Sequence, residues 1–190
     1  MNLFQIIMLA ISFYFAYQIY LHVNSLQDPK SAKKRQQRIS IVDPLYLVKR
    51  ADEAYESKNY SEALKLLRDA HAKDRTSTEI LNKLGFVLAK VGENDEAVEI
   101  YQESLKIDAG DDTVHNAIAS VYRTLQHFDK AKEHYEISLG IDSEYAVTYF
   151  NYANLLVDTG EIEKAREMYL KAIEIDKNFT QAKFELEKLK

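Results

Sequence analysis

The sequence contains no cysteine, and it has only two prolines and five glycines among its 190 residues. Without cysteine the chain can form no disulfide framework, iron–sulfur cluster or thiol nucleophile, and it lacks the usual zinc-finger ligands. Five glycines also leave little room for the glycine-rich loops that hold phosphate groups. These absences exclude several classes of enzyme and small secreted protein, and they direct attention to how the remaining residues are arranged.

Charge is distributed unevenly along the chain. Residues 1–40 carry five basic side chains and one acidic side chain, whereas residues 41–190 carry 20 basic and 29 acidic side chains, a net charge of −9. In the second part the basic residues alternate with acidic ones and form no stripe. Because such a surface repels phosphate overall, the sequence predicts no nucleic-acid partner.

The longest uncharged segment runs from Leu3 to Val23. As a helix its 21 residues would be about 31 Å long, which matches the roughly 30 Å hydrocarbon core of a bilayer. A buried core helix and a cleaved signal peptide are the alternatives. However, the run shows no polar stripe, no Lys or Arg precedes it, and it exceeds the roughly 7–15 residues of a signal-peptide core. We therefore expect residues 1–23 to be a transmembrane anchor.

A basic cluster follows the apolar run within residues 24–43, which we interpret as a basic juxtamembrane linker. By the positive-inside rule this cluster predicts a single-pass protein whose remaining residues lie in the cytoplasm. The cluster is interpreted either as a simple stop-transfer flank or as a docking site for acidic lipids or a protein. Its members are Lys30, Lys33, Lys34, Arg35 and Arg38.

Residues 44–179 repeat with a period of 34. When this segment is written in rows of 34 residues, small residues fall in two columns and a large residue falls in a third. No insertion breaks the period. A period of 34 with small residues at fixed places is typical of a two-helix solenoid repeat. Short turns are expected between the helices at residues 57–59, 92–94, 126–127 and 159–161. The columns are Ala51, Gly85, Ala119 and Ala153; Ala63, Ala97, Ala131 and Ala165; and Leu67, Tyr101, Tyr135 and Tyr169.

This pattern resembles the tetratricopeptide repeat family, and the last row matches it best through Tyr149, Tyr152-Ala153, Leu156, Ala165 and Tyr169. Four repeats are expected, at 44–77, 78–111, 112–145 and 146–179, followed by a capping helix at 180–190. With the apolar N-terminal run, the whole resembles a membrane-anchored protein of this family. The expected fold is all-α: a transmembrane helix, then an α-solenoid of four helix pairs and a C-terminal capping helix.

No arrangement of residues indicates catalysis. His71, His115, His127 and His134 fall in unrelated slots of the repeat and form no metal-binding motif. The Asp111-Asp112 pair stands where a helix should begin and is interpreted as a helix cap. We therefore predict no enzymatic activity, no cofactor and no metal site.

The family resemblance implies a concave groove lined by the first helix of each repeat. Asn151 and Asn154 stand three residues apart on one such helix, where two amides could bond a peptide backbone; the alternative is that they serve helix packing. Some relatives bind the C-terminal tails of chaperones through a two-carboxylate clamp, which has Lys and Asn in its first repeat. Val48 and Asp52 occupy those positions here, so the sequence predicts that this chain does not bind chaperone tails. The expected groove residues are Asn82, Lys83, Phe86, Lys90, Asn116, Ser120, Arg123, Phe150, Asn151, Asn154 and Asp158.

Two functions remain open on the sequence. One is an anchored adaptor, in which residues 3–23 hold the solenoid at a membrane and the groove recruits or assembles protein or peptide partners. The other is a structural accessory subunit, in which the anchor helix packs against other membrane subunits and the solenoid acts as a brace.

Overall fold

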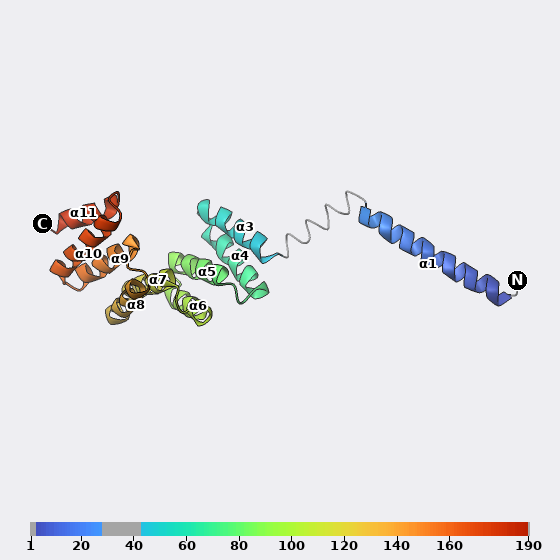
Figure 1. Cartoon of the computed structure of the whole chain (residues 1–190), viewed down its shortest axis with the longest axis horizontal. Helices are drawn as coiled ribbons and strands as arrows, with labels where there is room; N and C mark the ends of the chain where they lie inside the picture. Colours follow the sequence, from blue (N-terminus) through green and yellow to red (C-terminus); the bar gives the residue numbers. More distant parts are fainter. Residues whose placement is uncertain (1–2, 28–42, 190) are drawn as a thin grey trace. The chain divides into compact units, whose positions relative to one another are not determined.

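The computed structural model describes residues 3–27 and 43–189, which contain ten α-helices and no strand (Figure 1). The chain divides into two compact units between Leu47 and Val48. The expected all-α architecture is thereby confirmed for the described residues.

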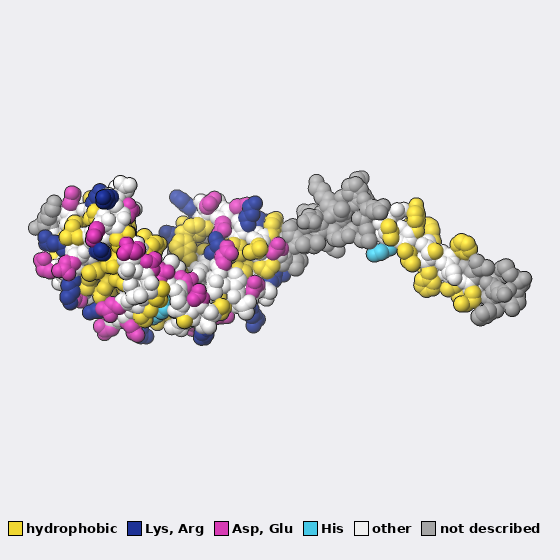
Figure 2. All heavy atoms as spheres, viewed as in Figure 1, with side chains coloured by type: hydrophobic (Ala, Val, Ile, Leu, Met, Phe, Trp, Pro, Cys, Tyr) yellow, Lys and Arg dark blue, Asp and Glu magenta, His cyan; other side chains and the backbone are white. Residues whose placement is uncertain are grey.

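Helix α1 runs from Leu3 to Gln27. In Figure 2 its described side chains are mostly hydrophobic, and none is acidic, lysine or arginine. Several of its large side chains are solvent-exposed, Phe13 by 70%. In the part of the chain that the structure describes, no helix combines the length and apolar character needed to cross a membrane. The transmembrane helix expected over residues 3–23 is thus not confirmed, and the basic cluster of the linker lies outside the described residues.

The repeat region consists of four helix pairs and one further helix. Successive first helices begin one sequence period apart, as do successive second helices, so the sequence period is also the structural period. The first helices are α3 (Pro44–Glu56), α5 (Thr78–Val91), α7 (Asp112–Thr124) and α9 (Ala146–Asp158). The second helices are α4 (Tyr60–Lys73), α6 (Asn94–Ile107), α8 (Phe128–Ile141) and α10 (Ile162–Ile175), and α11 (Thr180–Lys188) closes the array.

An aspartate ends every second helix and turns the chain toward the next repeat. The carboxylates of Asp74, Asp108, Asp142 and Asp176 each accept a hydrogen bond from the backbone N–H two residues later, at 2.8–3.0 Å. This is the Asx-turn, in which a short carboxylate replaces a backbone acceptor. The next first helix begins a few residues after each turn. At the start of α7 the Asp111 carboxylate caps the helix by accepting a hydrogen bond from the Val114 N–H at 3.1 Å. The cap expected at Asp111 is therefore present.

The small columns lie where the helices of a pair cross. Ala63, Ala97, Ala131 and Ala165 have no exposed surface, and Tyr135 fills the neighbouring space with none either. Because the small side chains allow close approach of the backbones, each pair packs tightly. First helices also touch one another, α5 against α7 and α7 against α9, which gives the array a face made of first helices.

The turn between the two helices of each repeat contains one residue in the left-handed region. These residues are Lys58 (φ 62°), Gly92 (φ 88°), Gln126 (φ 60°) and Gly160 (φ 78°), and they occupy the same position of successive repeats. The expected turns are present, but two repeats use a side-chain-bearing residue where glycine is favoured. Asn59 instead caps α4, accepting a bond from the Glu62 N–H at 3.3 Å.

We predict that Lys58→Gly and Gln126→Gly each raise the free energy of unfolding by about 0.5–1 kcal/mol. A left-handed L-residue costs about 1–2 kcal/mol, and the greater unfolded-state entropy of glycine offsets part of the gain. Urea denaturation followed by circular dichroism measures the change. Gly92→Ala, where an added Cβ meets no atom within 4 Å, is the matched control and should destabilise; a gain there would contradict the strain argument.

Helix α11 covers the end of the last pair. Its Ala182 side chain is fully buried, and the Arg166 guanidinium of α10 donates a hydrogen bond to the Leu189 carbonyl at 2.7 Å. A terminal helix with one apolar face is what a solenoid needs at its end. Residues 180–188 are therefore helical as expected, and their role as a cap stays a prediction.

Candidate functional site

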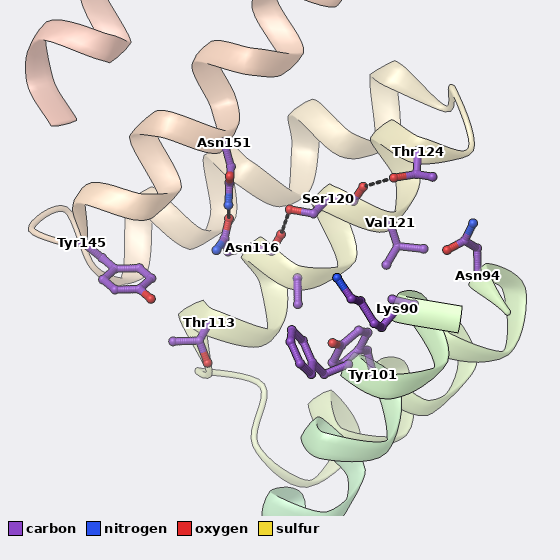
Figure 3. A pocket seen from close by; sticks show the side chains of 13 residues that line it. Lys90, Asn94, Tyr101, Thr113, Asn116, Ser120, Val121, Thr124, Tyr145 and Asn151 are labelled. Carbon is purple, nitrogen blue, oxygen red and sulfur yellow. Dashed lines mark hydrogen bonds between the residues drawn. The ribbon is translucent and has the colours of Figure 1, made fainter. Parts of the chain in front are cut away.

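The face made of first helices contains a pocket of about 490 Å³, mainly between α5 and α7 (Figure 3). Its wall is mixed: aromatic and small apolar side chains lie beside hydroxyls, amides and one lysine. Such a combination of apolar surface with a few polar groups is typical of a ligand site. The lining residues are Phe86, Ala89, Lys90, Asn94, Tyr101, Thr113, Asn116, Ala117, Ser120, Val121, Thr124, Tyr145 and Asn151.

An amide pair lies on the α9 side of the pocket. The Asn151 Nδ2 group donates to the Asn116 Oδ1 atom at 3.1 Å, and Figure 3 shows the two side chains facing each other. In the described residues no other hydrogen bond uses these two side-chain amide groups. Asn116 therefore keeps its NH₂ group and Asn151 its carbonyl oxygen, and flipping both amides only exchanges the two roles. One free donor beside one free acceptor matches the C=O and N–H of a peptide backbone.

The structure separates the two asparagines that the sequence placed together. Asn151 lines the pocket, but the Asn154 oxygen accepts a hydrogen bond from the Tyr169 hydroxyl and Asn154 does not line it. The two asparagines therefore take different partners, and the expected contact of Asn154 with a peptide stays a prediction. The amide pair that the structure shows joins neighbouring repeats, with Asn116 on α7 and Asn151 on α9.

Other expected groove residues hold the repeats together. Asn82 accepts from the Ser104 hydroxyl at 2.6 Å and donates to Asp111 at 3.1 Å, which uses both ends of its amide. Phe150 packs against Phe179 with ring centroids 5.0 Å apart. These residues position the first helices, which is the packing alternative considered for the asparagines.

Ion pairs neutralise two of the expected basic groove residues. Lys83 bonds Asp52 at 2.8 Å, and Arg123 bonds Asp158. Each pair joins one first helix to the next. Lys90 has no carboxylate within ion-pairing distance among the described residues, so it is the expected groove cation that retains an uncompensated charge at the pocket.

Sequence reasoning missed Tyr101, Thr113, Thr124 and Tyr145. Tyr101 belongs to a second helix, which the repeat pattern assigns to the opposite face. The sequence contained one signal of this contact. The residue that packs against Tyr101 is Gly85, whereas the other three repeats have alanine at the same position. A Cβ at Gly85 would lie 2.8 Å from the Tyr101 ring, so glycine lets this ring come closer to the first helix.

Two tetratricopeptide repeat models match the sequence, over residues 54–121 and 113–178. Together they cover most of the helical array. The chain belongs to the tetratricopeptide repeat family. Members of this family mediate protein–protein interactions.

Solved tetratricopeptide repeat structures share the fold at low sequence identity. MamA from Desulfovibrio magneticus is 18% identical over 77% of this chain and 82% of that chain, with a TM-score of 0.66. YrrB, described as having an unusual peptide-binding site, is 18% identical over 87% and 85%, with a TM-score of 0.65. The first such domain of Spaghetti (RPAP3), bound to an HSP90 peptide, is 23% identical over 59% and 89%, with a TM-score of 0.56. No curated protein matches the sequence.

The tetratricopeptide repeat fold also brings two histidines together that the sequence left unconnected. The Nδ1 atoms of His115 and His134 lie 3.1 Å apart across the α7–α8 pair. These two histidines are packing residues that contact each other, although they occupy unrelated slots of the repeat. One Nδ1 must carry the proton and the other accept it, so the contact needs at least one neutral ring. Burial, and secondarily His115, holds the pKa of His134 below its ordinary value.

We predict that this contact makes the repeat array less stable in acid. Because the folded pKa of His134 is depressed, the unfolded chain binds more protons below about pH 6.5, and the free energy of unfolding falls as pH falls through that range. Thermal unfolding between pH 7.5 and 5 measures it. His134→Asn keeps a donor and an acceptor near the Nδ1 position without a titrating ring and should flatten the profile; an equally steep profile would reject the assignment.

Proposed function

We propose that this protein is an interaction adaptor that binds a peptide segment of its partner along the face of first helices. The observation that carries the proposal is the Asn116–Asn151 pair, 3.1 Å apart at a pocket of about 490 Å³. Its spare donor and acceptor suit a peptide backbone, and the aromatic wall beside it suits a ligand side chain. The proposal extends to no enzymatic role and no cofactor.

The peptide-bound domain of RPAP3 and the peptide-binding site of YrrB support a peptide ligand by similarity of fold. The chain's own residues favour a ligand other than a chaperone tail. Asp52 and Val48 stand in the first repeat, and Asp52 already engages Lys83. Neither Val48 nor Asp52 supplies a cation at the first-repeat positions of a carboxylate clamp.

Display selection of peptides on the full chain in detergent tests the proposal. Replacing both Asn116 and Asn151 by alanine should weaken a selected peptide about ten-fold or more, because two hydrogen bonds contribute about 1–3 kcal/mol. Glu99→Ala with Gln102→Ala, both exposed on α6, is the matched control on a second helix. If the α6 variant loses the peptide and the asparagine variant keeps it, binding occurs on another face.

We further propose that residues 3–23 attach the protein to a membrane as a single-pass anchor, with the repeats in the cytoplasm. The supporting observation is that α1 exposes aromatic and aliphatic side chains, such as Phe13, Phe15 and Ile19, by 60–70%. Uncovered apolar surface of this extent needs lipid or another protein. The basic residues that follow the run in the sequence favour the cytoplasmic side.

Alkaline extraction of membranes tests the anchor, since the full chain should stay in the pellet and a chain lacking residues 3–27 should not. A cysteine placed at Gly110 should resist an impermeant maleimide in intact cells. Labelling before lysis would contradict the orientation. The alternative is an accessory subunit whose α1 packs inside a membrane complex; detergent copurification at fixed stoichiometry, lost with α1 but kept in the asparagine variant, would favour it.

A further inference from the structure

Three buried tyrosines occupy the same place in successive repeats. Tyr101, Tyr135 and Tyr169 are at most 3% exposed and lie one repeat apart on α6, α8 and α10. Phe86, Ser120 and Asn154 occupy equivalent groove positions on successive first helices. Each tyrosine follows the residue of its own repeat by the same number of positions. The repeat therefore provides an internal comparison in which the scaffold is constant and only the partner of the hydroxyl changes.

Two of these three tyrosine hydroxyls make hydrogen bonds within the protein. The Tyr135 hydroxyl lies 3.0 Å from the Ser120 Oγ atom, and the Tyr169 hydroxyl donates to Asn154. In the second repeat the corresponding residue is Phe86, which offers no acceptor. Among the described residues Tyr101 makes no hydrogen bond with its hydroxyl. Burial raises the pKa of Tyr101, so this hydroxyl stays protonated and able to donate.

The pocket is where the Tyr101 side chain meets the groove. Tyr101 lines it together with Phe86 and Lys90, and in Figure 3 Lys90 extends from α5 across the pocket toward α7. Lys90 follows Phe86 by four positions, so both stand on one face of α5. An unpaired ammonium and an unpaired hydroxyl thus border one chamber whose walls include Val121 and the Phe86 ring, which is 52% exposed.

We propose that this pocket binds a glutamate side chain within the partner's peptide segment. Its two methylene groups would pack on Phe86 and Val121, and its carboxylate would accept hydrogen bonds from the Tyr101 hydroxyl and the Lys90 ammonium. This inference rests on the proposed function, because it names the side chain that a groove-bound peptide presents.

An internal glutamate fits better than a chain terminus because the face of first helices extends on both sides of Phe86 and Lys90. The Asn116–Asn151 pair lies on one side, and on the other Tyr55 packs against Phe86 with centroids 5.3 Å apart. The remaining expected groove cations, Lys83 and Arg123, are neutralised by Asp52 and Asp158. Aspartate is one methylene shorter and would reach less far toward a hydroxyl that comes from the second helix.

The test uses the full chain in detergent and an acetylated, amidated heptapeptide library whose central residue is Glu, Gln or Asp and whose other positions are randomised without acidic residues. We expect the wild-type protein to retain the Glu library more than the Gln library by about ten-fold, since a hydrogen bond to a charged group has about that effect. Tyr101→Phe should remove most of this preference. Lys90→Gln should reduce it and make retention less sensitive to salt.

The control is Tyr135→Phe, which deletes the homologous hydroxyl and should leave the Glu preference unchanged. Melting temperature adds an independent readout: Tyr135→Phe should lower it, whereas Tyr101→Phe should not, since no protein bond is lost. Retention without a Glu preference, or a preference that survives Tyr101→Phe, overturns the inference while the proposed function stands.

Two further outcomes would also overturn the inference. If a library with free C-terminal carboxylates and no acidic side chains binds in a Tyr101-dependent way, the pocket binds a chain end. If no library binds, and replacing Asn116 and Asn151 leaves the binding of the display-selected peptide unchanged, the proposed peptide-binding function is contradicted as well.

Discussion

Replacing Tyr135 by alanine should lower the free energy of unfolding by about 3–5 kcal/mol, the cost of deleting a fully buried aromatic side chain. Tyr135 has no exposed surface. Its ring stacks on that of Tyr152 at a centroid distance of 5.6 Å, and its hydroxyl lies 3.0 Å from Ser120. Since domains are stable by about 5–15 kcal/mol in total, this loss removes a large part of the stability of the array.

Urea denaturation of the full chain in mild detergent, followed by circular dichroism, measures the loss. Tyr135→Phe keeps the ring and removes the hydroxyl, so it should cost only about 0.5–1.5 kcal/mol. The difference between the two variants isolates the packing of the ring. Equal losses would mean that the hydroxyl bond, and not the aromatic stack, stabilises this repeat.

Enlarging a small column should have the second largest effect. Ala63→Leu adds three carbons to a side chain with no exposed surface on α4, which forces the α3–α4 pair apart and should cost about 1–3 kcal/mol. Ala72→Leu on the same helix is the matched control, since Ala72 is exposed and its replacement should change stability by less than about 0.5 kcal/mol. Thermal unfolding compares the two, and similar midpoints would show that the column tolerates larger residues.

The sequence predicted the array of helices because several kinds of residue repeat with the same period of 34. Alanine or glycine at the crossings, aspartate at the exits and turn residues near 58, 92, 126 and 160 all recur once in every repeat. The positions of the left-handed residues themselves were less predictable, because Lys58 and Gln126 adopt a conformation that their residue types disfavour. Here the packing of the pair overrides local preference.

The site was predictable as a face but not as a set of contacts. Lys90, Asn116 and Asn151 were expected in the groove and do line its pocket. Their relationships depend on neighbouring repeats: Asn116 meets Asn151 across 35 residues, and Lys83 meets Asp52 across 31. One helix read alone shows none of these pairings. Tyr101 was missed because its ring reaches the pocket from the second helix beside Gly85.

The order of contacts along the array also determines how the molecule comes apart. In the described residues each helix pair touches mainly the pairs before and after it, so the array can fray from an end while its middle stays closed. The pocket lies between α5 and α7, in the second and third pairs. A protease that removes α11 would take away no residue that lines the pocket, whereas a transient opening of α9 and α10 would remove Asn151 and Tyr145 from its wall. Binding should therefore outlast the loss of the chain's end, and amide hydrogens of α5 to α8 should exchange most slowly.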